Sequence, residues 1–490
     1  MYKNFFLIFV TKVLFRKNNM TYQLLKYKIF KQKVLLISIL TIFIICIFPA
    51  YSKEQPAQIK NPDENATVLK GKVVTINLQS IVEYVLAQNI DMKIARARID
   101  QAKYYYKGSF ASFLPSITGF LPVERFQGGE IFYGPIPVSL TRTTYRPTLA
   151  GDFQIFTGGK PFFDSLVSKK QYNRIKIAYD TALQKTLLES CKIYFEWLKN
   201  SADVEVANQA LKEAEVQLQY NNSRLKTGFG TKLDVLQTKT LLLDRKSLLL
   251  RAENQKDSSR IILASLLNIP PSEEMEPEKT FIEPLMLWDK DLTLPQLYEI
   301  AAKTRPDIIE LTYLLAQARA QYGSSVAGLF PSINAGCYTR GIGPDINALD
   351  NSAQGSLSLN LNLLKNLGVG SWSDLKVTKA RIKEAILNKE KLLNDIYKTI
   401  TQAYYDCKYA EQQLQITKEK IEDAKEAHRI ALARLKTGIG LNLEVIYAQS
   451  QLTKANLEYQ SAVKAYNSSQ VELLYECGQL TPNKILAAFR

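Results

Sequence analysis

The sequence contains one motif twice. The string "RLKTGFGTKLDVLQ" at residues 224–237 returns as "RLKTGIGLNLEVIY" at residues 434–447, which is an offset of 210 residues. Each copy carries a Gly-x-Gly, inside a long stretch that holds no other glycine. A chain with two equivalent motifs of this kind is an internal duplication, so its fold is expected to repeat one structural unit.

The stretches around the two motifs also lack proline, from residue 162 to 269 and from residue 345 to 481. A helix interior excludes proline, and a glycine there costs about 1 kcal/mol. Each stretch therefore predicts two helices that meet at a Gly-x-Gly corner. The predicted helices cover about residues 163–226, 231–268, 372–436 and 441–477. Helices of this length are not stable alone and must supercoil or bundle.

The duplication extends upstream of the long helices. Residues 78–117 align with residues 294–333 at an offset of 216, without gaps, and the alignment places Pro115 on Pro331. In each half we predict one helix of about 35 residues that ends at this proline. We expect this helix and the shorter return helix to stack end to end beside the long helix.

Between these helices, each half contains a stretch in which apolar and polar residues alternate. The string "GSLSLNLNLL" at residues 355–364 alternates leucine with serine and asparagine, and Leu149, Phe153 and Ile155 alternate with polar neighbours. A period of two predicts strands, each paired in a hairpin with the strand that follows the proline of its half. The resulting sheet is either half-buried in a soluble protein or part of a membrane barrel with lipid outside and water inside.

The N-terminus has the features of an export signal. Residues 1–52 carry eight of the 63 Lys and Arg residues and none of the 47 acidic residues, and they end in an apolar run and Ala50-Tyr51-Ser52. This predicts a cleaved signal peptide; the alternative is an uncleaved membrane anchor. Export, and the lack of extra sequence to cover a sheet, favour the barrel. Two hairpins cannot close one, and membrane strands tolerate no open edge, so several chains must share it.

Other classes of function have little support. Half of the formal net charge of +16 lies in the signal, and the remaining basic residues alternate with acids along helices, which is typical of a solvated face and not of nucleic-acid binding. The cysteines beyond the signal are far apart and form no CxxC, so we predict buried thiols and neither a zinc site nor a disulfide framework. His428 is the only histidine, and it lies in an Ala/Lys/Glu-rich helix where we expect it to face solvent, so we predict neither a histidine-based catalytic triad nor a metal cluster. We predict no enzyme activity, no metal and no cofactor.

Taken together, these motifs resemble those of the TolC-like outer-membrane efflux protein family. The resemblance rests on the duplicated plan, on the "RLKTGxGxxL[DE]V" motif twice, and on five further strings. These are "FLPSI" and "LFPSI", "IFTGGK" at residues 155–160, "RPDI" at residues 305–308 and "ECGQL" at residues 476–480. The resemblance implies an α+β membrane protein: a trimer with four strands per chain in a 12-stranded β-barrel, continued by a hollow 12-helix α-barrel of coiled-coil hairpins.

The resemblance also implies a division of the chain. The segments are the signal peptide (1–52), an N-terminal equatorial segment (53–77), the first repeat (78–268), an equatorial linker (269–293), the second repeat (294–477) and a C-terminal equatorial tail (478–490). The equatorial segments would form a belt around the middle of the helical tunnel.

The function that the resemblance implies is an outer-membrane channel-tunnel for a tripartite efflux or type I secretion assembly. Its partners would be two further copies, outer-membrane lipid, a periplasmic adaptor, and an inner-membrane pump or ABC transporter. The cargo would be set mainly by the inner-membrane partner. The alternatives are a secreted coiled-coil scaffold and a periplasmic adaptor without channel activity. An adaptor resembles a single helical hairpin flanked by small β domains, whereas this chain has two hairpins.

The repeated motif supplies the first group of candidate site residues, because in the family these corners receive the tips of the adaptor. The group consists of Arg224, Leu225, Lys226, Thr227, Gly228 and Gly230, and of Arg434, Leu435, Lys436, Thr437, Gly438 and Gly440. A purely structural interpretation covers part of it: a corner needs φ > 0, which glycine supplies, and basic residues are favourable at a helix C-terminus.

A second group of candidates lies just beyond the corners. Asp234 and Glu444 occupy equivalent places in the first turns of the return helices, where an acid stabilises the helix dipole by about 0.3–1 kcal/mol. In the family, acids here form or support a narrow periplasmic gate. Glu444 matches the first gate acid, Asp234 the acid that helps hold the gate closed, and Tyr447 stands where a second gate acid would be.

Overall fold

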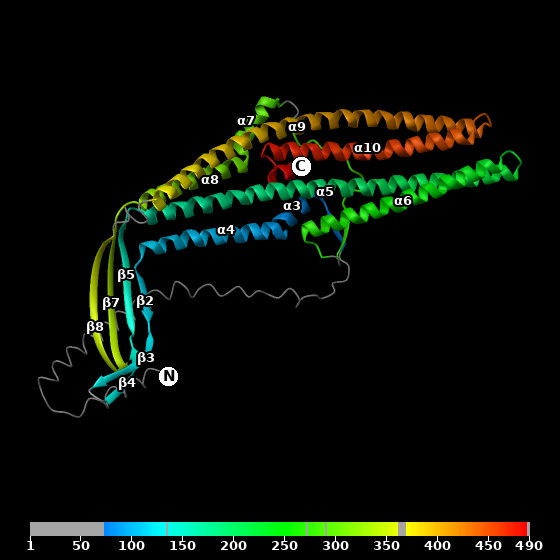
Figure 1. Ribbon diagram of the computed structural model, residues 1–490. Helices are drawn as coiled ribbons and strands as arrows, with labels where there is room; N and C mark the ends of the chain where they lie inside the picture. Colours follow the sequence, from blue (N-terminus) through cyan, green and yellow to red (C-terminus); the bar gives the residue numbers. More distant parts are fainter. Residues whose placement is uncertain (1–72, 134–135, 271–272, 290–291, 361–368, 488–490) are drawn as a thin grey trace, which may run out of the picture. The chain divides into compact units, whose positions relative to one another are not determined.

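The computed structural model describes residues 73–487, except 134–135, 271–272, 290–291 and 361–368. The predicted signal peptide lies outside these residues. Four long helices dominate the rest: α5 (Lys160–Lys226), α6 (Lys232–Leu267), α9 (Val369–Lys436) and α10 (Asn442–Glu476). The predicted helices are confirmed, with ends that differ by at most a few residues. Helix α5 packs against α6 and α9 against α10, and α10 also packs on α5 (Figure 1).

The order of contacts places the four helices in a row. The row runs α9, α10, α5, α6, so α9 and α6 are its outer members. Val445 and Ala448, near the start of α10, are 1% and 8% exposed. None of the described helices combines the length and the apolar character needed to cross a membrane.

Six of the described strands form one antiparallel sheet, in which the strands differ in length. Its members are β2 (Ser116–Phe120), β3 (Val123–Tyr133), β4 (Ile136–Tyr145), β5 (Thr148–Thr157), β7 (Ser332–Asp345) and β8 (Ala348–Asn360). Four of them lie side by side in the order β2, β5, β7, β8, while β3 and β4 pair with each other and β4 touches β7. The pairing of β2 with β5 and of β7 with β8 confirms the two predicted hairpins.

The prediction of four strands per chain was wrong in number. Pro122 and Pro147 interrupt the first hairpin, so each of its arms is divided into two strands. Proline has no N–H to donate to a neighbouring strand. The interruptions lie between β2 and β3 and between β4 and β5.

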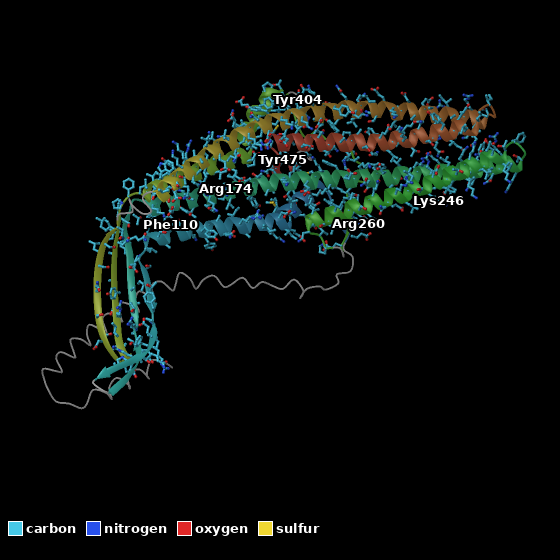
Figure 2. The ribbon with its side chains drawn as sticks, in the orientation of Figure 1. Phe110, Arg174, Lys246, Arg260, Tyr404 and Tyr475 are labelled. Carbon is cyan, nitrogen blue, oxygen red and sulfur yellow. The ribbon has the colours of Figure 1, made fainter. Side chains whose placement is uncertain are left out.

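Neither face of the outer strands is covered within the described chain. Strand β2 is exposed along its whole length and β8 everywhere except at the half-buried Leu349, and Leu357 and Leu359 on β8 are 73% and 63% exposed. Figure 2 shows the side chains of these strands. A half-buried soluble sheet would hide its leucine face, so this arrangement favours the second alternative, in which lipid covers that face.

The helices upstream of each hairpin differ from the prediction. We predicted one helix of about 35 residues in each half, whereas each half has two helices with a break between them. These are α3 (Leu78–Ala87) and α4 (Ile90–Ser109), followed by the 3₁₀ turn η3 (Phe110–Phe113), and α7 (Leu294–Thr304) and α8 (Pro306–Ala327). The breaks lie at Asn89, which caps α4, and at Arg305, whose backbone is extended because Pro306 follows it.

The two breaks make equivalent contacts, although their residues differ. Nδ2 of Asn89 donates to the carbonyl oxygen of Leu266 at 2.7 Å. Nη1 of Arg305 donates to the carbonyl oxygen of Glu476 at 2.9 Å. The chain just beyond each acceptor is left-handed, with φ of 56° at Asn268 and 66° at Gly478. Both return helices therefore end in the same way, and the duplication is preserved in three dimensions.

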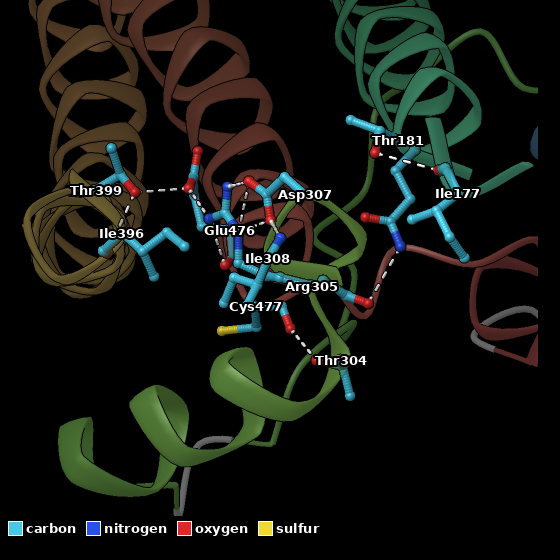
Figure 3. Close-up of polar contacts among 12 residues, drawn as sticks. Ile177, Thr181, Thr304, Arg305, Asp307, Ile308, Ile396, Thr399, Glu476 and Cys477 are labelled. Carbon is cyan, nitrogen blue, oxygen red and sulfur yellow. Dashed lines mark hydrogen bonds and ion pairs between the residues drawn. The ribbon is translucent and has the colours of Figure 1, made fainter. Parts of the chain in front are cut away.

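In the second half the break carries an ion cluster (Figure 3). Arg305 pairs with Asp307 and with Glu476, each at 2.7 Å, and Thr399 donates to the carboxylate of Glu476 at 2.7 Å. The Arg305 side chain is only 11% exposed. Burial alone would lower the pKa of Arg305, but the hydrogen bonds and charges of Asp307 and Glu476 raise it above its ordinary value. The guanidinium therefore stays charged and joins Asp307 of α8 to Glu476 of α10, which in turn accepts from Thr399 of α9.

The segments before the first repeat and between the repeats contribute to a smaller sheet. Strand β1 (Val73–Ile76) pairs in parallel with β6 (Glu274–Pro277). Asn467 and Gln470 of α10, both 0% exposed, bond to the backbone between residues 283 and 287. The linker is thus fixed to α10. Its role in an equatorial belt remains a prediction.

The short helix α11 (Pro482–Ala487) follows α10.

The prediction of buried thiols holds for three of the four described cysteines. Cys191, Cys407 and Cys477 are buried, but Cys337 is exposed. Cys337 lies on β7, in the uncovered sheet, so the prediction was wrong for this residue.

Candidate functional site: the two helix corners

The first glycine of each corner reverses the chain. Gly228 and Gly438 both have φ of +78°, in the left-handed region that glycine adopts without strain. A Cβ atom added at either position would meet nothing within 4 Å. The backbone therefore favours glycine for its dihedral angle, while the space beside it remains open.

The second glycine of each corner is required for a different reason. The prediction that all four glycines serve a positive φ was wrong for Gly230 and Gly440, which do not have one. A Cβ at Gly230 would lie 2.9 Å from Cβ of Arg224, and a Cβ at Gly440 would lie 2.9 Å from the carbonyl carbon of Arg434. The two glycine amides donate to these arginine carbonyl oxygens at 3.0 and 2.9 Å. The second glycine lets the chain close back onto the last helical turn.

The threonines of the motif also have a structural role. Oγ1 of Thr227 donates to the carbonyl oxygen of Arg224 at 3.1 Å, and Oγ1 of Thr437 donates to that of Arg434 at 3.0 Å. Carbonyls in the last turn of a helix lack intrahelical partners, and each hydroxyl adds a donor to a carbonyl that also accepts from the corner amides. These hydrogen bonds explain why both corners contain the threonine, and no ligand is needed to explain it. Lys226 and Lys436 are exposed.

The apex of each corner presents a large apolar side chain to solvent. Phe229 is 80% exposed and Ile439 is 77% exposed. Leu233, Leu441 and Leu443 beside them are 63%, 65% and 59% exposed. Burying such a side chain is worth about 1.5–3 kcal/mol, and a cluster of exposed apolar groups marks an interaction surface. The change from Phe229 to Ile439, which breaks the sequence repeat, preserves this chemistry.

The flanks of the two corners differ. Leu435 is 2% exposed and packs with Val445 and Tyr220, whereas its equivalent, Leu225, is 39% exposed. The second corner therefore rests on the first hairpin, and the corresponding flank of the first corner is open in a single chain.

The candidate gate residues lie in unlike environments. Asp234 forms a capping box with Thr231: its Oδ2 accepts from the Thr231 amide at 3.0 Å, and its own amide donates to the Thr231 hydroxyl at 3.1 Å. Helix capping therefore accounts for Asp234. Glu444 makes no such box and lies 3.7 Å from Nη1 of Arg434. Tyr447 is 66% exposed.

A residue that the sequence analysis missed connects the two corners. Asn442 is 4% exposed, and its Oδ1 accepts from Gln217 at 3.1 Å and from Asn221 at 2.8 Å. Its Nδ2 lies 3.3 Å from both the carbonyl oxygen of Asp234 and the hydroxyl of Thr238. We call this set the Asn442 cluster. The offset of 210 could have revealed it, since the equivalent positions hold Lys232, Ala427, Ala431 and Ala448.

The geometry defines a class of protein. Two long helical hairpins end in matching exposed corners, and their other ends lead into a sheet with exposed faces, which is the plan of an outer-membrane channel. The sequence profile of the outer membrane efflux protein family matches residues 81–268 and 297–478. These residues make up most of the chain, so the protein belongs to the outer membrane efflux protein family.

Individual relatives agree with this assignment. The probable efflux pump outer membrane protein TtgC of Pseudomonas putida is 23% identical over 430 residues, which cover 83% of each chain. The crystal structure of the CmeC outer membrane channel of Campylobacter jejuni matches with a TM-score of 0.70 at 17% identity, over 82% of this chain and 85% of that one. The MtrE outer membrane channel of Neisseria gonorrhoeae, in its open state, matches with a TM-score of 0.68 at 19% identity, over 83% and 90%.

The protein is thus an outer-membrane efflux channel component, with a large helical portion in the periplasm. Its relatives are channel and efflux proteins and not enzymes.

Proposed function

We propose that three copies of this chain form one closed channel across the outer membrane, and that its six corners dock a periplasmic adaptor. The adaptor would connect the channel to an inner-membrane pump or ABC transporter in a tripartite efflux or type I secretion assembly. The observation that carries this proposal is the pair of matching corners with exposed Phe229 and Ile439 at their apices. Six similar tips in a ring suit a ring of similar partners.

The sheet supports the closed trimer. Among the described strands, β2 and β8 are paired on one side only. An unpaired edge inside a membrane leaves backbone groups unsatisfied, and pairing β8 of one chain with β2 of the next would remove both edges. Four adjacent strands per chain then give the expected 12-stranded barrel, and the four long helices per chain the 12-helix tunnel. A scaffold or adaptor would have no use for the exposed leucines of β8.

The gate is the second part of the proposal. Glu444 and Tyr447 from three chains would surround the periplasmic mouth, with a ring of carboxylates that attracts cations. Arg434, near Glu444, would moderate this field. Asp234 is the weaker candidate, because its carboxylate is already used in the capping box.

The corners can be tested with variants that separate bulk from backbone strain. Gly228→Trp and Gly438→Trp place a large side chain in open space at the docking surface, whereas Gly228→Asn keeps a small residue that tolerates φ > 0. We expect both tryptophan variants to abolish export of an efflux substrate from cells that carry the pump and adaptor, while trimer assembly and outer-membrane insertion persist. The asparagine variant should export. Normal export by the tryptophan variants, or failure only through loss of the trimer, would reduce the corners to structural turns.

A further inference from the structure

The ends of three helices enclose a groove next to the sheet. It lies where α5 begins, α8 ends and α9 begins, and Figure 1 shows these helix ends beside the ends of the strands. Its larger part has a volume of about 740 Å³, and a smaller part of about 260 Å³ continues it between α8 and α9. Gln321 and Arg381 line both parts. Along α9 the lining runs from Gly370 to Asn388, which is ~27 Å at ~1.5 Å per residue.

The walls of the larger part are polar. Among the described residues that line it, only Val377 has an apolar side chain, and the others are charged, amide, hydroxyl or glycine residues. An apolar molecule would leave these groups without partners. The groove therefore favours a ligand that carries charges or many hydrogen-bonding groups.

Four charged side chains in the groove are available to a ligand. Lys160 and Asp374 line the larger part, Glu384 lines the smaller part, and Arg381 lines both. All four are exposed, and none forms an ion pair with a described residue. Arg381 and Glu384 stand three residues apart on α9, where side chains are neighbours.

A buried acceptor lies beside this pair. Gln317 of α8 lines the same smaller part of the groove. Its Oε1 atom is buried and has no hydrogen-bond partner in the described part of the chain. A guanidinium, a carboxylate and an amide oxygen are therefore free at one place, on two facing helices.

This set matches the charged group of an α-amino acid. The guanidinium of Arg381 can hold a carboxylate with two parallel hydrogen bonds. The carboxylate of Glu384 and Oε1 of Gln317 both accept, as an ammonium requires. A molecule with an ammonium and a carboxylate on one carbon presents both charges close together, and neither charge alone would satisfy all three side chains. The rest of the ligand would extend toward Lys160 and Asp374.

The groove faces away from the exposed aromatic side chains of the same helices. Phe162 lies two residues after Lys160, and Trp372 lies two residues before Asp374, so each is on the opposite side of its helix. Both are 61% exposed, and Nζ of Lys376 lies 5.0 Å from the ring centroid of Trp372. Aromatic and basic side chains of this kind are typical of a membrane–water interface. The groove therefore faces the lumen of the proposed channel.

We propose that this groove is a transit site in the channel wall for exported molecules that carry a free α-amino acid group. A site in a conducting pathway must release what it binds. The charges of the groove are exposed to water, which keeps binding weak. The proposal rests on the closed channel of the proposed function, because it requires that the groove face a lumen.

Protection of an introduced cysteine tests the proposal. Val377→Cys places a thiol in the groove, and Ile386→Cys places one nine residues away on the opposite side of α9, both combined with Cys337→Ser. The two native side chains are 50% and 46% exposed, so the positions are matched. The detergent-solubilised protein is labelled with a maleimide, with and without L-glutamine. We expect L-glutamine to slow labelling of the Val377→Cys variant and to leave the Ile386→Cys variant unaffected.

Analogues and a second substitution define the ligand class. N-acetyl-L-glutamine lacks the ammonium and L-glutaminamide lacks the carboxylate, so each should need about tenfold more for the same protection, because a charge-assisted pair is lost. Arg381→Gln should weaken protection by L-glutamine by a similar factor. Arg381 is exposed and unpaired, so this variant should fold normally. The control is Lys389→Gln, which removes an equal charge one residue beyond the groove and should have no effect.

Each other result overturns a stated part of the proposal. Absence of protection up to the solubility limit of L-glutamine, or equal protection of the Ile386→Cys variant, refutes the site. Equal protection by either analogue refutes the ligand class, and full protection in Arg381→Gln refutes the role of the guanidinium. Failure of the proposed function is a separate result: the unaltered chain would be a stable monomer by mass measurement in detergent, whatever the labelling shows.

Discussion

The ion cluster at the break between α7 and α8 gives the most direct test of the energetics. Arg305, Asp307 and Glu476 have side chains that are only 11%, 24% and 15% exposed. The equivalent break in the first half is joined by a neutral amide, Asn89, through the same kind of bond to a helix carbonyl. Arg305→Asn therefore copies the first half into the second, and leaves two carboxylates without their cation.

The size of the effect follows from that burial. Breaking a buried ion pair by removing one partner costs about 3–5 kcal/mol. Because Asp307 keeps about a quarter of its surface exposed, we expect about 2–4 kcal/mol for Arg305→Asn. A matched control, Arg305→Asn with Asp307→Asn and Glu476→Gln, removes all three charges and should regain more than half of the loss.

Thermal unfolding of the detergent-solubilised protein, followed by helical circular dichroism, ranks the variants. The expected order of Tm is native, then the triple variant, then Arg305→Asn alone. If Arg305→Asn alone unfolds at the native temperature, water already screens the cluster and the reasoning from burial is refuted. If the triple variant is no more stable than the single one, the loss comes from the missing hydrogen bonds of arginine and not from unpaired charge.

Three further predictions concern the thiols, the gate and the corner backbone. Burial raises the pKa of Cys191 to about 12. Burial also raises the pKa of Cys477, to about 11, although the charges of Lys484 and Arg305 oppose the shift. Both thiols are protonated at pH 8, so a maleimide should label Cys337 in the folded protein and the buried thiols only after denaturation. Labelling of Cys191 in the folded state would contradict its burial. Glu444→Gln should weaken cation preference or loosen closure in planar bilayers without lowering Tm, because an exposed ion pair contributes about 0–1 kcal/mol; unchanged conductance and selectivity would remove Glu444 from the gate. Gly440→Ala should destabilise its corner by about 1–3 kcal/mol through overpacking, visible as faster amide exchange confined to that corner, and exchange at the native rate would show that the backbone moves aside.

The long helices could be predicted because their signal is local. Absence of proline and glycine over a long stretch leaves helix as the main option, and the corner glycines mark the ends to within a few residues. The break at Pro306 also had a local signal, since proline favours the first turn of a helix, and the prediction of one continuous helix overlooked it. Asn89 also had a local signal, since asparagine is a favoured N-cap residue and its Oδ1 accepts from the Met92 amide at 3.0 Å. Only its bond to Leu266 in a distant helix had no local signal.

Other features depend on long-range pairing that no local pattern encodes. Strands β1 and β6 have four residues each and lie far apart in the chain. Each is too short to show a period of two, and their pairing is set by the packing around them. Asn442 is similar, since an asparagine in the first turn of a helix is usually a solvated residue. Only comparison of the two repeats, position by position, shows that the second half places an amide where the first half has Lys232.

Comparison of the two repeats distinguishes two surfaces of each corner: the apex, which faces outward, and the flank, which faces a neighbouring helix. Phe229 and Ile439 differ in sequence but have nearly the same exposure, as a shared partner at the apex requires. Leu225 and Leu435 are identical in sequence but differ from 39% to 2% exposed. In a single chain the exposed Leu225 is not stabilised by burial, whereas Leu435 fills a packed site. If α9 of a second chain covers Leu225 as the first hairpin covers Leu435, the two leucines become equivalent, and the apparent asymmetry is a property of the isolated chain.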